Sequence, residues 1–223
     1  MVYFDESFTR FFNQLKKQNH RDWFIQNKTV YEEKVKKPFE KLAGDLIGRM
    51  QKLHPGFELE IKDAIFRINR DIRFSADKSP YKTYVSAVIG AGGRKNMTDP
   101  GMYLQLEAGS ISIFGGIYMP EKESLSKIRT AIMEQPEEVE RLKKDKKFVA
   151  MYGKLQGETN KVLPPEFREA VKNEPLIAHK QFYFSAKYDD GKTLFRKDLL
   201  DFIMKHHEVG IPWTNFLYRA IHA

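Results

Sequence analysis

The spacing of the apolar residues changes along this chain, from a helical period to an alternation of two, and that change limits the folds open to it. Up to residue 53, apolar side chains recur at every third or fourth position, which predicts amphipathic helices. The first helix follows the capping candidates Asp5 and Ser7, and a second helix start lies at 19–22. The longer helix after it contains Pro38, which should kink it or begin a new segment, and it ends before Pro55-Gly56.

From about Ala64 the apolar residues alternate with polar ones, which is typical of β-strands with one buried face. In the first such run, apolar side chains stand at positions 66, 68, 72 and 74. Further strands are predicted at 83–89, 102–107, 110–119 and 181–187. Within the run 110–119, Gly115-Gly116 indicates a bulge or a close approach of another backbone.

Helical spacing returns after Pro120, again after Pro136, and once more between Leu199 and Ile221. Helices at both ends of the chain and strands clustered between them predict an α+β fold, with a largely antiparallel central sheet on which the N-terminal and C-terminal helices pack. No internal repeat, low-complexity tract or Gly/Ser linker interrupts the sequence. We therefore expect residues 1–223 to form a single α+β domain.

The composition excludes several classes of protein. There is no cysteine, which argues against a disulfide scaffold and against thiolate metal sites. The six histidines include no pair at metal-ligand spacing, so we expect neither a metal nor another cofactor. No basic segment precedes an apolar run at the N-terminus, and no stretch approaches the roughly 20 apolar residues that span a bilayer. These features predict a cytoplasmic protein with no membrane partner.

The net charge of +8, with a pI near 9.4, favours anionic partners. The residues with most chemistry lie in the run 65–82. If that run is a strand, Arg67 and Arg73 share one face with Asp71, about 20 Å apart at its two ends. The two arginines then cannot grip one small phosphate together.

A closer group is predicted where the strand ends. Five side chains carrying positive charge or hydroxyl groups could converge around the 77–80 loop: Arg73, Ser75, Lys78, Ser79 and Lys82. Cations, hydroxyls and loop amides together make an oxyanion site. The alternative is a solvated loop in which Asp71 and Asp77 neutralise the nearby cations.

Two further polar features stand on the predicted sheet. Arg70 falls on the apolar face of its run, which indicates either a structural ion pair or a functional arginine inside a pocket. Tyr103, Gln105 and Glu107 alternate with apolar residues, and with Tyr183 and Ser185 they could form a polar sheet surface. Glu107 is then either a general base or, more simply, an ion-pair partner.

These residues favour one function over two alternatives, and they do not say whether the protein is an enzyme. The leading hypothesis is binding, with or without turnover, of a small anionic or phosphate-bearing ligand through Arg67, Arg73, Lys78 and Lys82. The first alternative is a nucleic-acid-binding module that uses aromatic side chains such as Tyr81, Tyr84 and Tyr103. The second is a protein-interaction scaffold, whose sign would be an exposed apolar patch.

Several motifs across nearly the whole chain resemble one family. They are His20-Arg21-Asp22-Trp23-Phe24, Asn27-Lys28, Pro38-Phe39, the run Arg70-Asp71-Ile72-Arg73-Phe74-Ser75-Ala76-Asp77-Lys78-Ser79-Pro80-Tyr81-Lys82, Pro100-Gly101-Met102-Tyr103 and Gly116-Ile117-Tyr118-Met119-Pro120. Together they resemble the family of uncharacterised proteins called domain of unknown function 2461. The resemblance implies one domain and supplies no reaction. His20 stands where such a sequence is expected to carry a small polar residue, usually Asn, which argues against a functional role for that histidine.

Overall fold

The N-terminal region is helical, as the apolar spacing predicts. The structure, a computed structural model, describes all of residues 1–223. Helix α1 (Glu6–Lys17) begins at Asp5, whose carboxylate accepts a hydrogen bond from the amide of Ser7 at 2.7 Å. Its apolar stripe of Phe8, Phe11, Phe12 and Leu15 is buried. The capping residue and the buried face are therefore both the predicted ones.

The long N-terminal helix is divided at the predicted place. After α2 (Arg21–Gln26) and α3 (Lys28–Tyr31), a π-helical turn at Glu32–Lys36 leads into α4 (Lys37–Leu53). Pro38 stands in the first turn of α4, directly after the π-helical turn. Pro38 thus begins a new helical segment, which is one of the two outcomes that the sequence allows.

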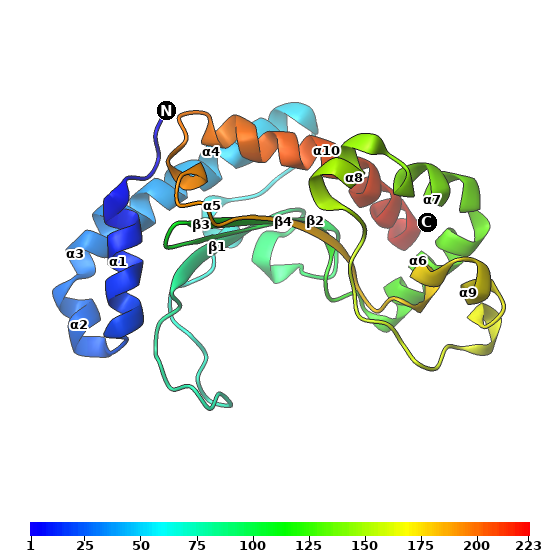
Figure 1. Cartoon of the computed structure of the whole chain (residues 1–223), viewed down its shortest axis with the longest axis horizontal. Helices are drawn as coiled ribbons and strands as arrows, with labels where there is room; N and C mark the ends of the chain where they lie inside the picture. Colours follow the sequence, from blue (N-terminus) through cyan, green and yellow to red (C-terminus); the bar gives the residue numbers. More distant parts are fainter. The chain divides into compact units, whose positions relative to one another are not determined.

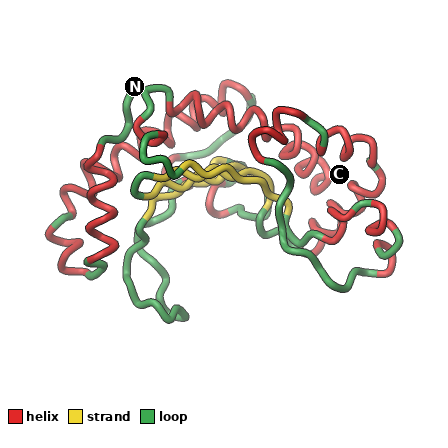
Figure 2. The backbone as a smooth tube through the Cα atoms, in the orientation of Figure 1, coloured by secondary structure: helices red, strands yellow, loops and turns green.

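Four strands form one antiparallel sheet, drawn in yellow in Figure 2. Their order in the sheet is β1-β2-β3-β4. Their bounds are β1 (Tyr84–Ile89), β2 (Gly101–Glu107), β3 (Ser110–Ile117) and β4 (Phe182–Tyr188). Along β2, the apolar side chains of Met102, Leu104 and Leu106 are buried while the polar residues between them stay half-buried. Helix α4 contacts β1 (Figure 1). The α+β class and the antiparallel sheet are confirmed.

The remaining elements complete the chain. The helices are α5 (Ile61–Ala64), α6 (Lys122–Glu134), α7 (Pro136–Lys143), α8 (Lys146–Tyr152), α9 (Ala170–Asn173) and α10 (Leu199–His222), and short 3-10 turns lie at Gly93–Lys95, Pro165–Phe167, Pro175–Ala178 and Thr193–Phe195. Pro212 lies inside α10, which continues through it. No helix is long and apolar enough to cross a membrane.

The strand predicted from about Ala64 to Phe74 is wrong. Only Ile65 and Asn69 make isolated bridges, to Ala87 and Tyr81, and the backbone between them follows no regular ladder. We call residues 65–83 the arm; in Figure 2 it is a loop that leaves the sheet at the start of β1. The alternating pattern fails at its outer end, where no apolar surface covers it: Ile68 is buried, whereas Phe74 is 96% exposed.

Contacts divide the chain into two compact units whose segments alternate along the sequence. Unit 1 comprises 1–95, 103–113 and 187–204, and unit 2 comprises 96–102, 114–186 and 205–223. The N-terminal helices and the arm belong to unit 1, whereas α6 to α9 belong to unit 2. The expectation of a single domain stays a prediction.

Candidate functional site

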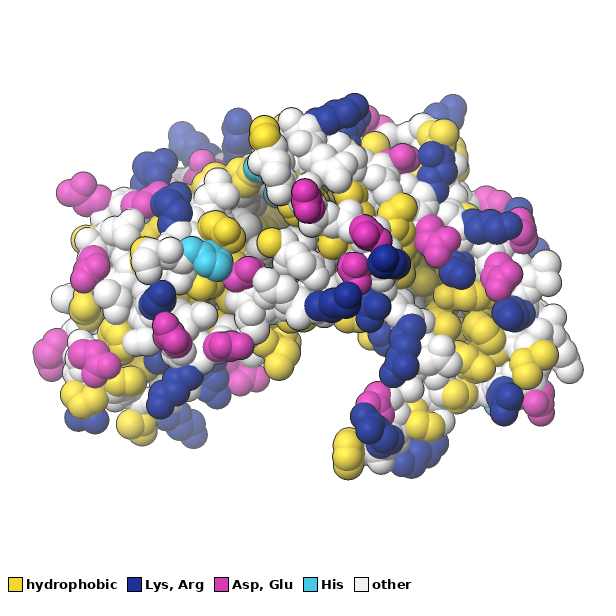
Figure 3. All heavy atoms as spheres, turned by 180° about the vertical axis from the view of Figure 1, so that it is seen from behind, with side chains coloured by type: hydrophobic (Ala, Val, Ile, Leu, Met, Phe, Trp, Pro, Cys, Tyr) yellow, Lys and Arg dark blue, Asp and Glu magenta, His cyan; other side chains and the backbone are white.

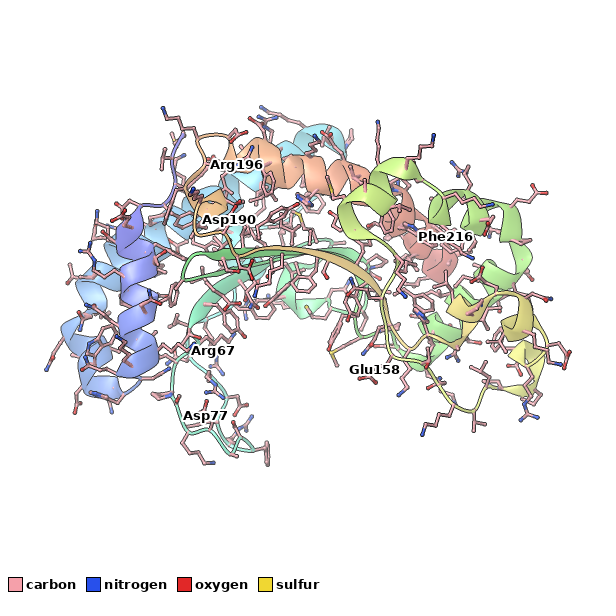
Figure 4. All side chains as sticks on the ribbon, in the orientation of Figure 1. Arg67, Asp77, Glu158, Asp190, Arg196 and Phe216 are labelled. Atoms are coloured by element: carbon pink, nitrogen blue, oxygen red, sulfur yellow. The ribbon has the colours of Figure 1, made fainter.

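A cleft of about 580 Å³ lies beside the arm in unit 1. We call it the arm cleft, and its lining residues are Lys16, Asn19, Arg70, Asp71, Asp77, Ser79, Tyr81, Lys82, Thr83 and Tyr84. Lys16 and Asn19 come from the end of α1 and the turn after it, and the others come from the arm and the start of β1. Figure 4 shows Arg67 near the root of the arm and Asp77 toward its tip.

One side of the cleft is fixed by the contact between Asn19 and Tyr81. The amide of Asn19 donates to the Tyr81 carbonyl oxygen at 2.8 Å and accepts from the Tyr81 N–H at 3.1 Å, as a neighbouring strand would. The Tyr81 ring is 8% exposed and stacks on Phe24, with the ring centroids 4.1 Å apart. The returning half of the arm is therefore held against the corner between α1 and α2.

Arg70 closes the outer part of the arm. Its guanidinium forms an ion pair with Asp77 and donates to the Ser75 hydroxyl at 3.3 Å. Asp77 also accepts a hydrogen bond from the Ser79 amide at 2.9 Å. Hydrogen bonds from Ser79, and to a smaller extent the one from Arg70, hold the pKa of the Asp77 carboxyl below its usual range. Of the two interpretations offered for Arg70, a structural ion pair or a functional arginine in a pocket, the structure shows the ion pair. Arg70 also lines the cleft.

Arg73 and Lys78, both predicted as ligand-binding residues, do not line the arm cleft. Arg73 makes a bidentate ion pair with Asp71, at 3.0 and 2.7 Å, which lowers the pKa of that carboxyl. The Lys78 ammonium donates to the carbonyl oxygen of Ile72 at 3.0 Å. Their charges are used inside the arm, which matches the alternative of a solvated loop with internally neutralised cations.

Lys82 and Arg67 lie close together at the root of the arm. The Lys82 ammonium is 5.1 Å from the ring centroid of Phe66 and 5.8 Å from that of Tyr84. Burial, and to a lesser extent the charge of Arg67, lowers the pKa of Lys82. Neither cation has a carboxylate partner, and Lys16 on the opposite wall has none either.

A chain of hydrogen bonds runs along the open face of β2. The hydroxyl of Tyr103 donates to Gln105 at 2.9 Å, and the Gln105 amide donates to Glu107 at 2.7 Å. Burial raises the pKa of Tyr103, whose ring packs on Phe66 at the arm root with the centroids 6.2 Å apart. Glu107 makes no ion pair, so the expectation of an ion-pair partner is wrong. Tyr183 and Ser185 belong to unit 2, where Ser185 donates to Gln156 at 3.3 Å.

Six residues of the cleft lie outside the predicted ligand-binding and pocket residues: Lys16, Asn19, Asp77, Tyr81, Thr83 and Tyr84. The signal for Asn19 was present, because it directly precedes the His20-to-Phe24 motif. His20 itself begins α2, its Nδ1 accepting from the Trp23 amide at 3.3 Å, and this helix-capping role explains why a small polar residue is suited to that position.

The features expected of a nucleic-acid surface are mostly missing. Tyr81 is buried, so it offers no face to a base, and Tyr84 and Tyr103 are half-buried. Figure 3 shows basic side chains along the protruding arm with acidic ones among them at its tip, rather than a stripe of one sign. No group of three or more His, Asp or Glu side chains is placed to hold a metal ion.

The fold defines an α+β protein with an antiparallel sheet, and a polar cleft lies beside its arm. Residues 7–216 match a family model described as conserved hypothetical protein (DUF2461), and the chain belongs to that family. The resemblance seen in the sequence motifs is thereby confirmed. No curated protein and no solved structure matches the chain.

Proposed function

We propose that the arm cleft binds a small anionic ligand that carries a phosphate or a carboxylate group. The observation that supports this most directly is Lys82, a half-buried ammonium in the cleft wall with no carboxylate partner. Burial without a partner disfavours its charged form, as the lowered pKa indicates. An anion in the cleft would supply the missing partner.

Two more cations support the same site. Arg67 is close enough to lower the pKa of Lys82, and Lys16 lines the facing wall. Like charges placed together destabilise the empty site and would be neutralised by one bound anion. The hydroxyl of Thr83 adds a donor beside them.

The carboxylates at the cleft do not cancel this charge. Asp77 is held by Arg70 and Ser79, and Asp71 is held by Arg73. Of the four cations in the leading hypothesis, only Lys82 lines the cleft; Arg67 lies outside the lining but near Lys82, and Lys16 joins Lys82 in place of Arg73 and Lys78. Glu107 does not line the cleft, so we assign it no role in the ligand's chemistry.

Isothermal titration calorimetry with pyrophosphate and with citrate tests the proposal. Lys82→Gln should weaken binding about tenfold or more, because a charge-assisted hydrogen bond is worth about 1.5–3 kcal/mol. Lys78→Gln is the matched control, because it removes one positive charge from the same arm outside the cleft and frees no carboxylate. It should change the affinity less than about twofold, since exposed charges at a distance are screened by salt.

Equal weakening by Lys82→Gln and Lys78→Gln would contradict a defined site and would indicate attraction by net charge alone. Tight binding of a short oligonucleotide, lost steeply with salt, would instead support the nucleic-acid alternative. The exposed Phe74 ring at the arm tip is the one observation that favours the interaction scaffold. Phe74→Ser should leave pyrophosphate binding unchanged, which separates that alternative from the cleft.

A further inference from the structure

The environment of Lys82 differs from that of the other lysines at the arm. Its Nζ lies 5.1 Å from the ring centroid of Phe66 and 5.8 Å from that of Tyr84, and the side chain is half-buried. Lys16 and Lys78 are both exposed, and the ammonium of Lys78 donates to a backbone carbonyl oxygen at 3.0 Å. Among these three amines, only that of Lys82 is shielded by aromatic rings.

No acceptor in the protein holds a proton on the Lys82 amine. The two carboxylates of the cleft are engaged elsewhere, Asp71 with Arg73 and Asp77 with Arg70. The aromatic rings beside Nζ attract a cation, but they accept no proton. The Lys82 amine therefore keeps its proton without the help of an ion pair.

The neighbouring positive charges act against that proton. Burial, and then the charge of Arg67, lowers the pKa of Lys82, and Lys16 faces it from the end of α1. The other titratable groups of the lining that carry no ion pair are the phenols of Tyr81 and Tyr84. A lysine is nucleophilic only when it has lost its proton, and burial beside another cation favours that form.

The Lys82 side chain is also within reach of a small molecule. It lines the arm cleft, whose volume of about 580 Å³ is in the range of small-molecule sites. Thr83 and Tyr84 of the same wall carry hydroxyl groups that can hydrogen-bond a carbonyl oxygen. A shielded amine, an open cleft and neighbouring cations are the features of lysines that react with carbonyl compounds.

We propose that the Lys82 amine forms a Schiff base with a small aldehyde or ketone that carries a carboxylate or phosphate group. This rests on the proposed function, because the anionic group of the carbonyl compound occupies the same cleft. In pyrophosphate binding, the Lys82 ammonium helps to hold the anion. In the reaction, the fraction of Lys82 without its proton attacks, while Lys16 and Arg67 attract the anionic group.

The step balances without another reactant. The lone pair of Nζ attacks the carbonyl carbon, the carbonyl oxygen takes up a proton and the nitrogen loses one, which gives a carbinolamine. The nitrogen lone pair then forms the C=N bond as the hydroxyl group takes up a proton and leaves as water. When it is protonated, the imine keeps one positive charge beside the rings of Phe66 and Tyr84.

Reductive trapping with glyoxylate tests the proposal. Glyoxylate is an aldehyde that carries a carboxylate, and sodium cyanoborohydride delivers hydride to the imine carbon, which fixes the adduct as N-carboxymethyl-lysine. Peptide mass spectrometry then compares Lys82 with Lys78 in the same sample, near neutral pH. Lys82 should be modified about tenfold or more faster, which is the gain that one charge-assisted hydrogen bond to the carboxylate supplies.

Acetaldehyde separates the reactivity of the amine from the attraction of the anion. Because acetaldehyde is neutral, the ratio of Lys82 to Lys78 modification should be smaller than with glyoxylate. The Lys82 rate should also reach half of its plateau at a lower pH than the Lys78 rate. A role in structure alone would not shift that pH profile.

Two substitutions on α1 locate the anionic group. Lys16→Gln should slow the modification of Lys82 by glyoxylate about two- to fivefold and leave its modification by acetaldehyde unchanged. Lys17→Gln removes the neighbouring exposed charge, which lies outside the lining of the arm cleft, and should alter neither rate. Equal effects of the two substitutions would overturn the placement of the anionic group.

Pyrophosphate should protect Lys82 from glyoxylate. The inference fails if Lys82 is modified no faster than Lys78, or if both amines become reactive over the same pH range. If pyrophosphate binding is still weakened by Lys82→Gln in that case, only the Schiff base is excluded and the anion site stands. Equal ratios with glyoxylate and acetaldehyde, together with no protection by pyrophosphate, would contradict the anion site itself.

Discussion

The ring of Phe184 in unit 2 packs closely against two glycines, Gly115 and Gly210, at which an alanine would crowd it. A Cβ built on Gly210 would lie 2.4 Å from Cζ of the ring, and one built on Gly115 would lie 2.3 Å from the same atom. Phe184 is buried, with its ring centroid 4.6 Å from that of Tyr152 and 5.2 Å from that of Phe148. The ring therefore has no free space into which it can move.

This packing predicts that Gly210→Ala destabilises the protein although it adds a helix-favouring residue to α10. The added methyl overpacks the core, which costs about 1–3 kcal/mol, while alanine returns about 0.5–1 kcal/mol of helix propensity. The expected net loss is about 1–2 kcal/mol. For a chain of this size that lowers the melting temperature by about 2–8 °C.

Gly48→Ala is the matched control, because Gly48 lies inside α4 and a Cβ there meets nothing within 4 Å. It should raise the melting temperature by about 1–4 °C. Thermal unfolding followed by circular dichroism measures both variants. In a Phe184→Leu background the cost of Gly210→Ala should shrink. A rise in melting temperature for Gly210→Ala, or a cost that Phe184→Leu leaves unchanged, would refute the enclosure of the ring.

Three other predictions follow from single contacts. Burial, with a smaller effect of Lys205, lowers the pKa of His206 to about 4. In the unfolded chain the same imidazole takes up a proton near pH 6.5, so acid favours the unfolded state. The free energy of unfolding should therefore fall by about 3 kcal/mol as the pH drops from 6.5 to 4. Urea unfolding at several pH values should show this loss in the parent and not in His206→Asn; equal slopes would refute it. Asn19→Asp removes the donor to the Tyr81 carbonyl, so trypsin should cut the arm faster than in the control Asn173→Asp, and equal rates would contradict the anchoring role. If Lys82 holds the anion, the affinity for pyrophosphate should fall as alkaline pH removes the proton of Lys82, and this fall should begin below the ordinary lysine pKa. Lys82→Arg should remove that pH dependence, because arginine keeps its charge. The same pH dependence in both proteins would exclude Lys82 as its source.

The elements that local spacing could predict are those whose partners lie on the same element or beside it. The stripe from Phe8 to Leu15 and the cap at Asp5 determine α1 within one helix. The alternation of β2 identifies its buried side, because a strand between two neighbours must bury one face and leave the other for polar groups. The polar chain from Tyr103 to Glu107 follows from the same alternation.

The arm could not be predicted, because its conformation depends on contacts far apart in the sequence. Alternation from Phe66 to Phe74 resembles a strand, yet its apolar side is uncovered at the outer end around Phe74, and Pro80 has no N–H to continue a ladder. Asn19 and Tyr81, which anchor the arm, are 62 residues apart. No local pattern shows that an asparagine after one helix will pair with a distant backbone.

The charges of the arm explain why the predicted group of cations separates in the structure. Between residues 67 and 82 there are five cations and only two carboxylates. Asp71 and Asp77 pair with Arg73 and Arg70, and the carbonyl oxygen of Ile72 takes Lys78. The two cations left over are Arg67, which is exposed, and Lys82, which is half-buried beside aromatic rings at the root. Unpaired charge thus remains on Lys82, where burial disfavours it, and an anion bound there would stabilise the protein by supplying the missing partner.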